Sequence, residues 1–167
     1  SETSIQDAAD GIRTTDTFPK GSCKSVLVDG KTVNISGIAK GSGMIAPDMA
    51  TMLVYIFTDA KLEQPLLQSI LSELTDLTFN NITVDSDTST SDTLLLAATG
   101  KADAPEITDL RSKASKDFSE ALEAVMMNLA HQVVRDGEGA TKFVEIRVTG
   151  AASDADARTH ALANRHG

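Results

Sequence analysis

The sequence predicts one α/β domain over residues 1–167, because strand-like and helix-like segments alternate along it without a linker or an internal repeat. Three observations carry this prediction. Asp29 and Gly30 stand between two β-branched runs, which is the strongest short signal for a hairpin. An almost continuously apolar stretch at 51–58 predicts a buried strand, and apolar residues at intervals of three and four over 115–135 predict a helix.

The first forty residues are expected to form a helix and a hairpin. Residues 1–12 suit a short helix that ends near Gly11, and the following "TTDTFPKGS" carries turn-forming residues and should be a loop. The two β-branched runs then predict paired strands at Ser25–Val28 and Thr32–Ile38.

The middle of the chain is expected to supply the centre of the sheet. The stretch "TMLVYIFT" at 51–58 has so few polar residues that both faces of the strand should be covered. The segment "LEQPLLQSILSEL" predicts a helix with Pro65 in its first turn, where the missing N–H costs little. A second buried strand is predicted by "TLLLAATG" at 93–100.

The last third of the chain is expected to form a helix, a strand and a helix. The stretch "TKFVEIRVTG" at 141–150 alternates in the manner of a strand with one wet face. Ser153, with Asp156 three residues later, predicts the start of a final helix. The long helix at 115–135 should present one apolar stripe, made of Phe118, Leu122, Val125, Met126, Leu129 and Val133.

Composition argues against several classes of function. The net charge of −9 would repel a phosphate backbone, so a nucleic-acid partner is not expected. Apolar runs fall short of the about 18 residues that span a membrane. Cys23 is the only cysteine and the first residues lack a secretory pattern, so a cytoplasmic location is expected. His131, His160 and His166 share no ligand spacing with Cys23, and no metal site is predicted.

Three further features receive a plain interpretation from their pattern alone. The stretch "TVDSDTSTSDT" at 83–93 begins like a calcium loop, but Thr90 and Leu96 occupy the positions of its glycine and its final glutamate. It is interpreted as a turn in which Asp and Thr side chains bond their own backbone. By pattern, Lys40 is a surface charge and Glu138 is a solvated residue of a glycine-flanked turn.

Four separated blocks carry a resemblance to a known family. These blocks are "TTDTFPK", "GIAKGSGMIAPDMATML", "ITVDSDTSTSDT" and "DGEGATKFVEIRVTGA", and together they cover nearly the whole chain. In this order they closely resemble the ornithine acetyltransferase family, the bifunctional glutamate N-acetyltransferases of arginine biosynthesis. The resemblance implies a layered α/β sandwich around a central strand that bears the nucleophile.

The resemblance also implies a chemistry at the seam before the apolar strand. In this family the precursor cuts itself at the bond that corresponds to Ala50–Thr51, and the exposed threonine is the catalytic nucleophile. The Thr51 hydroxyl attacks the Ala50 carbonyl, and water then releases a free N-terminus. The α-amine has an unperturbed pKa of about 8, so it can take the proton of its own hydroxyl during acetyl transfer through an acetyl-threonyl enzyme.

The resemblance implies substrate contacts as well. Thr14, Lys40 and Glu138 match positions that bind substrate together with Thr51. A lysine suits the carboxylate shared by N-acetylornithine and glutamate, and a glutamate suits a substrate ammonium. No cofactor is implied, although some members accept acetyl-CoA as the acetyl donor. The family assembles as a hetero-oligomer of the two cleaved chains.

The chain departs from the family pattern in length. Family members carry an N-terminal portion with a Thr-Gly oxyanion-hole pair and a C-terminal portion with further substrate contacts, and this sequence matches neither. Losing one oxyanion donor can cost about 10²–10³ in turnover. Two hypotheses therefore remain: a self-cleaving acetyltransferase that moves acetyl from N-acetylornithine to glutamate, or a partial chain that is an inactive structural core. Asp48 also stands where many relatives have Asn.

Overall fold

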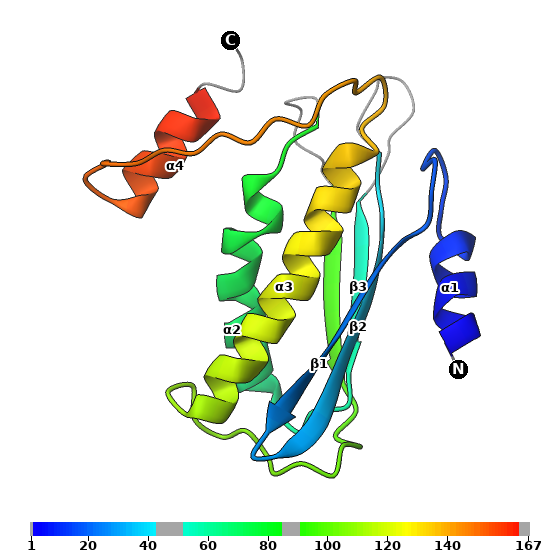
Figure 1. The fold of residues 1–167 in the computed structure, drawn as a ribbon, viewed down its shortest axis with the longest axis vertical. Helices are drawn as coiled ribbons and strands as arrows, with labels where there is room; N and C mark the ends of the chain where they lie inside the picture. Colours follow the sequence, from blue (N-terminus) through cyan, green and yellow to red (C-terminus); the bar gives the residue numbers. More distant parts are fainter. Residues whose placement is uncertain (1, 43–51, 85–90, 164–167) are drawn as a thin grey trace.

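The structure is a computed structural model and describes residues 2–42, 52–84 and 91–163. Its elements along the chain, shown in Figure 1, are α1 (Glu2–Gly11), β1 (Lys20–Val28), β2 (Lys31–Lys40), β3 (Leu53–Thr58), α2 (Gln64–Leu77), the 3₁₀ turn η1 (Phe79–Asn81), β4 (Thr93–Ala98), α3 (Lys113–Arg135) and α4 (Asp154–Ala163). The expected α/β class is confirmed.

The four strands form one mixed sheet in the order β1-β2-β3-β4. The β1–β2 and β2–β3 pairs are antiparallel, and β3 and β4 are parallel, joined by a crossover through α2. Asp29 and Gly30 have φ values of 48° and 78°, the positive angles that a two-residue type I′ hairpin turn needs. The predicted hairpin is confirmed, and its strands extend further, because pairing continues to Lys20 opposite Ala39.

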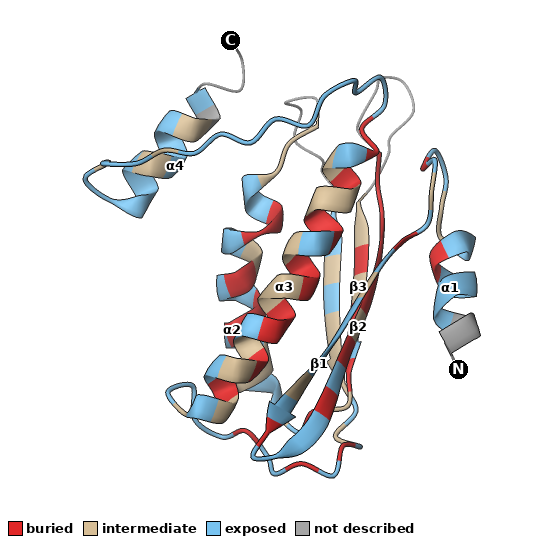
Figure 2. Cartoon of the chain, viewed as in Figure 1, coloured by how far each residue is buried: buried red, intermediate tan, exposed pale blue. Residues whose placement is uncertain are grey.

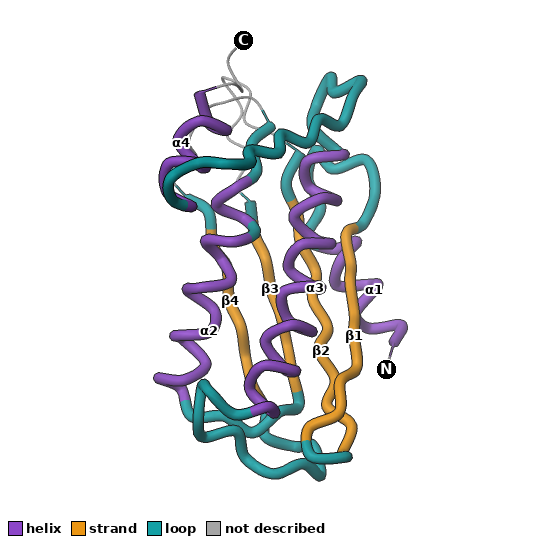
Figure 3. The backbone as a smooth tube through the Cα atoms, turned by 60° about the vertical axis from the view of Figure 1, so that its left-hand side comes forward, coloured by secondary structure: helices purple, strands orange, loops and turns teal. Residues whose placement is uncertain are grey.

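Two helices cover one face of the sheet, and a third lies on the other side. Figure 3 shows α2 and α3 side by side over the strands, whereas Figure 1 places α1 on the opposite side, where it contacts β1 and β2. The predicted stripe of α3 is confirmed, since all six of its residues are buried. The helix approaches β2 closely at Gly37, where an added Cβ would lie 2.8 Å from Leu129 Cδ1.

The sheet is covered less completely than the sequence predicts. On β3, Val54 and Ile56 are fully buried under the helices, but Phe57 on the other face is 45% exposed. Leu95 on β4 is also 45% exposed, and it is the register partner of Tyr55, which lies on the same face as Phe57. Figure 2 shows exposed and covered stretches along the strands of the sheet. The expectation that 51–58 is covered on both faces and that 93–100 is buried is therefore wrong for the described residues, since α1 lies only over β1 and β2.

The predicted strand at 141–150 is also wrong. This segment is an extended connection between α3 and α4 without strand pairing in the described chain, and Val144 is 70% exposed. An alternating segment becomes a strand only where it runs along a sheet edge and pairs with it, and this segment instead runs past η1 and the end of α3. The final helix is confirmed, because the Ser153 hydroxyl accepts a hydrogen bond from the Asp156 N–H at 3.1 Å.

Three other expectations can be compared with the structure. The first helix ends at Gly11, and α2 carries Pro65 in its first turn, both as predicted. The turn proposed for 83–93 lies largely outside the described residues. Within the described ranges, none of the helices is both long enough and apolar enough to cross a membrane.

Candidate functional site

Three segments that are distant in the sequence meet at the end of β2 farthest from the hairpin turn. The loop after α1 reaches β2 through two contacts: Lys40 Nζ lies 3.4 Å from the Thr14 hydroxyl, and the Thr15 and Ser42 hydroxyls are 2.6 Å apart. The turn after α3 reaches the same place, because the Glu138 N–H donates to the Ser42 carbonyl at 2.6 Å. The structure thus brings Thr14 and Lys40 into contact and ties the Glu138 backbone to Ser42, two residues after Lys40.

Lys40 is not the surface charge that its local pattern suggests. The residue is only 6% exposed, on the face of β2 opposite the helices. The Thr14 hydroxyl is its hydrogen-bond partner in the described chain, and no carboxylate there forms an ion pair with it. An ammonium group has three donors, and burying it without an anion is costly. Lys40 therefore retains both the capacity and the electrostatic reason to bind an anionic group.

Glu138 has a different environment. It is exposed and sits in a turn with Gly139 at a φ of 73°, so its carboxylate reaches solvent as the sequence pattern suggests. The turn borders a cavity of about 300 Å³ that is also lined by the loop after α1 and by Ser42, two residues after β2, whereas Thr14 and Lys40 are not among its lining residues. This cavity is lined by Thr15, Thr17, Ser42, Arg135, Asp136, Gly137, Glu138, Gly139 and Ala140.

A buried ionic cluster lies under these three segments, and the sequence analysis missed it. Lys20 is fully buried, and its Nζ lies 2.5 Å from Asp16 Oδ1 and 2.5 Å from Asp136 Oδ2. The Lys20 ammonium also stands 4.7 Å from the centre of the Phe18 ring. The Asp16–Lys20 spacing of four was visible in the sequence, but no local signal connects either residue with Asp136.

Both carboxyls of this cluster are held in the charged form. Burial alone would raise the pKa of Asp16, but the Gly41 N–H and the Lys20 ammonium outweigh it and hold that pKa below its ordinary value. Burial likewise opposes ionisation of Asp136, whose pKa is nevertheless lowered by Lys20 and by hydrogen bonds from the Thr17 hydroxyl and N–H.

The expected nucleophile Thr51 and the Ala50–Thr51 bond lie outside the described residues. Residues on both sides of this stretch, Gly41 before it and Met52 after it, have defined contacts. Met52 donates its N–H to the Asp92 carboxylate at 3.0 Å and lies against Gly41, where an added Cβ would be 3.5 Å from Met52 Cα. Leu53 is the register partner of Lys40 across the β2–β3 pair. The start of β3 therefore adjoins the Lys40 site.

Comparison with known proteins identifies the family. A model described as the ArgJ family matches residues 1–164. The chain belongs to the ArgJ family. It is 67% identical over 159 residues to the arginine biosynthesis bifunctional protein ArgJ of Ruegeria pomeroyi, covering 95% of this chain and 38% of that protein. It is 58% identical to the same-named protein of Gluconobacter oxydans, covering 93% of this chain and 37% of that one.

A solved structure supports the ArgJ fold. The crystal structure of the arginine biosynthesis bifunctional protein ArgJ from Bacillus halodurans superposes with a TM-score of 0.62 at 42% sequence identity. The match covers 65% of this chain and 50% of that one. The chain thus spans well under half the length of the curated ArgJ relatives described above.

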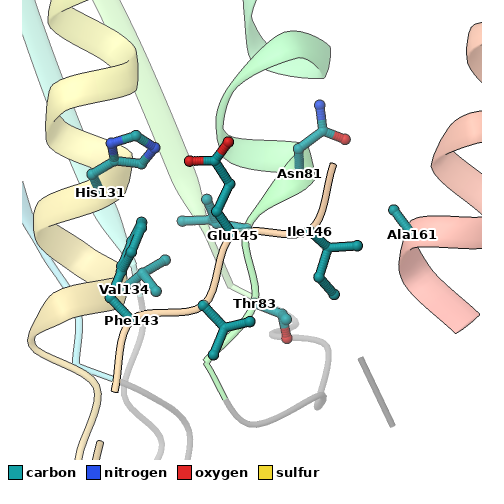
Figure 4. A pocket seen from close by; sticks show the side chains of 10 residues that line it. Asn81, Thr83, His131, Val134, Phe143, Glu145, Ile146 and Ala161 are labelled. Atoms are coloured by element: carbon teal, nitrogen blue, oxygen red, sulfur yellow. The ribbon is translucent and has the colours of Figure 1, made fainter. Parts of the chain in front are cut away.

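A second cavity of this ArgJ chain, of about 200 Å³, is shown in Figure 4, and neither Lys40 nor Thr14 is among its lining residues. The His131 ring of α3 packs edge-to-face on Phe143 with centroids 5.3 Å apart, and the Arg135 guanidinium lies 5.2 Å from the same ring. Figure 4 shows His131 and Glu145 reaching toward the same space. The described residues hold no group of three His, Cys, Asp or Glu side chains placed to bind a metal ion.

Proposed function

We propose that this chain is the central part of an N-terminal-threonine acetyltransferase that moves acetyl from N-acetylornithine to glutamate. The observation that carries the proposal is Lys40, a nearly buried ammonium that contacts Thr14 and lies opposite Leu53, two positions after Thr51. Membership of the ArgJ family supports the reaction class, because the relatives are named as bifunctional proteins of arginine biosynthesis.

The proposed chemistry begins with scission of the Ala50–Thr51 bond. The Thr51 hydroxyl oxygen attacks the Ala50 carbonyl carbon, the C–N bond breaks, and the hydroxyl proton goes to the nitrogen, which becomes a free α-amine. Water then hydrolyses the resulting ester. The cut leaves Thr51 with a hydroxyl nucleophile and an amine base on the same residue.

Acetyl transfer follows in two steps that reuse these groups. The Thr51 oxygen attacks the acetyl carbonyl of N-acetylornithine while the α-amine takes the hydroxyl proton, and ornithine leaves with that proton on its nitrogen. The glutamate amine then attacks the acetyl-threonyl ester and restores the hydroxyl. Acetyl-CoA is a second proposed acetyl donor, because attack of the Thr51 oxygen on its thioester would form the same acetyl-threonyl ester and release the CoA thiol.

The described residues would bind the parts of the substrate that do not react. The Lys40 ammonium would pair with the α-carboxylate common to both amino acids, with Thr14 beside it. Glu138 is exposed at the rim of the 300 Å³ cavity and would face a substrate ammonium. The two cleaved pieces would remain together as a hetero-oligomer, because β2 and β3 lie on opposite sides of the cut and pair along six residues.

Mass spectrometry of a trapped intermediate tests this function. Protein expressed at the length its gene encodes is incubated with N-acetylornithine, quenched in acid and digested. One acetyl group is expected on the peptide that begins at Thr51, and none in Thr51→Ala. Thr32→Ala, a change at an exposed hairpin threonine, is the matched control and should be acetylated normally. Undiminished acetyl transfer by Thr51→Ala would refute the proposal.

A second candidate is that these 167 residues form a structural core that does not catalyse alone. The observation that favours it is length, since the chain corresponds to 38% of the Ruegeria pomeroyi relative. The isolated 167-residue chain would then fold without transferring acetyl, while protein of gene-encoded length would be active. Acetyl transfer by the isolated chain would rule this candidate out.

A further inference from the structure

The ionic cluster of Lys20, Asp16 and Asp136 joins three separate parts of the fold. Asp16 lies in the loop after α1, Lys20 begins β1, and Asp136 follows the last residue of α3. Lys20 and Asp136 are separated by 116 positions, yet Lys20 Nζ lies 2.5 Å from a carboxylate oxygen on each side. The Lys20 and aspartate side chains are almost entirely withdrawn from solvent.

Each carboxylate also accepts hydrogen bonds from residues that surround the candidate site, mostly from their backbone N–H groups. Asp16 accepts hydrogen bonds from the Gly41 N–H at 2.7 Å and from the Thr14 N–H at 3.3 Å. Asp136 accepts from the Thr17 N–H at 2.9 Å and from the Thr17 hydroxyl. The cluster therefore fixes Thr14 directly and also fixes the residue that follows Lys40.

The same cluster orients the turn that carries Glu138. Asp136 donates its own N–H to the Gln132 carbonyl at the end of α3, so its position is tied to the helix as well as to Lys20. Glu138 is two residues further on and donates its N–H to the Ser42 carbonyl. A shift of Asp136 would consequently move Glu138 relative to the end of β2.

Stability alone does not account for burying three charges. Buried ion pairs are often no more stabilising than apolar side chains of similar volume, because desolvation offsets their attraction. Charge-assisted hydrogen bonds are directional, however, and they define the relative position of the groups that they join. The arrangement is thus better suited to fixing geometry than to adding stability.

We propose that Lys20, Asp16 and Asp136 form a positioning cluster, which holds Thr14, Lys40 and Glu138 in the arrangement that binds the amino-acid substrate. The geometric part depends only on the described contacts, and the identity of the substrate rests on the proposed function. The three residues position the site through the backbone and do not themselves touch the reacting atoms.

Amide hydrogen exchange tests the geometric part without any assay of activity. In Lys20→Met, which removes the charge and keeps the length, the Gly41 and Thr17 amides should exchange at least about tenfold faster. The Ile56 amide, within the central strand β3, reports global unfolding and should be accelerated only by the factor that the measured loss of unfolding free energy predicts. Lys31→Met is the matched control, because Lys31 pairs with Asp103 on the surface with both side chains exposed.

If Lys20→Met does not fold, two other variants test the same proposal. Asp136→Asn retains an acceptor oxygen and should speed exchange at Thr17 more than at Gly41. Asp16→Asn should do the reverse, because its contact is with Gly41. Unchanged exchange at both amides in all the variants that fold would overturn the proposal.

Kinetics with protein of gene-encoded length test the link to substrate. Below the unfolding transition, Lys20→Met should raise KM for N-acetylornithine about tenfold or more, with a smaller change in kcat, whereas Lys31→Met should change neither. Faster amide exchange with an unchanged KM in active enzyme would overturn the positioning role. A wild-type protein without acetyl transfer would refute the proposed function alone, and the exchange result would still decide whether the cluster positions these segments.

Discussion

Lys40 Nζ lies 3.4 Å from the Thr14 hydroxyl, although 26 positions separate the two residues in the sequence, and Lys40 is only 6% exposed. The contact connects the end of β2 with the loop after α1. It leaves a nearly buried cation whose hydrogen-bond partner in the described chain is one neutral hydroxyl. A carboxylate ligand would complete this environment.

Replacing Lys40 should therefore weaken substrate binding more than folding. A charge-assisted contact to a carboxylate is worth about 1.5–3 kcal/mol, which is one to two decades in affinity. In protein of gene-encoded length, Lys40→Ala should raise KM for both N-acetylornithine and glutamate by about 10- to 100-fold. Lys31→Ala, at an exposed lysine, is the control, and equal KM values in the two variants would show that Lys40 does not bind substrate.

The Ala50–Thr51 bond should stay largely intact in the 167-residue chain by itself. The family resemblance assigns the oxyanion donors to a segment outside this sequence, and without such donors the tetrahedral intermediate is poorly stabilised. Intact-mass measurement over days at neutral pH should show little of the pieces 1–50 and 51–167. Prompt and complete scission would contradict this expectation, and scission that persists in Thr51→Ala would remove Thr51 from the mechanism.

Acid should destabilise the fold through the Lys20 cluster. The pKa values of Asp16 and Asp136 are lower in the folded state than the ordinary 3.8. A lowered pKa adds stability above the unfolded-state pKa, and that stability is lost as pH falls through the folded-state value. The free energy of unfolding should therefore decrease below about pH 4, measured by urea titration.

The substitution Asp136→Asn separates the contribution of this cluster to acid sensitivity from that of the other carboxyl groups of the protein. Asp136→Asn removes one of the two carboxyls, so its free energy of unfolding should be lower at neutral pH and should fall less steeply in acid than that of the wild type. Parallel curves for the two proteins would mean that Asp136 is not responsible for the acid sensitivity.

Gly37 should be intolerant of even a methyl group. An added Cβ would lie 2.8 Å from Leu129 Cδ1 and 3.2 Å from Ile56 Cγ1, so Gly37→Ala should cost about 1–3 kcal/mol of unfolding free energy. Gly21→Ala is the control on the adjacent strand, where the nearest atom is 3.9 Å away. Combining Gly37→Ala with Leu129→Ala should cost less than the sum of the two, and strict additivity would argue against the collision.

Local sequence patterns anticipated those parts of the fold whose determinants are local. The hairpin turn depends on Asp29 and Gly30 alone, and the α3 stripe depends on a periodicity within one helix, so both were predictable. Burial of Phe57 would need a helix over that face of β3, and strand formation at 141–150 would need a neighbouring strand to pair with. The pattern within one segment contains no information about either neighbour. Both of these predictions failed for the described residues.

Only the family resemblance pointed to the candidate site. Composition and spacing gave Lys40 and Glu138 ordinary surface roles, and the burial of Lys40 results from the loop after α1 and the start of β3 approaching it in space. The Lys20 cluster was missed because Asp136 is 116 positions away. Charges that become partners only after folding leave no periodic signal.

The separation of Lys20 from Asp136 has a consequence for the order in which the molecule folds. The hairpin closes over a two-residue turn and loses little chain entropy, whereas the ionic cluster must bring together segments from both ends of the chain. The hairpin end should therefore form early, and the end that carries Lys40 should form last. During native-state fluctuations the same end of the sheet would be the first to open. Because Lys40 lies there, local unfolding would compete with substrate binding at that end.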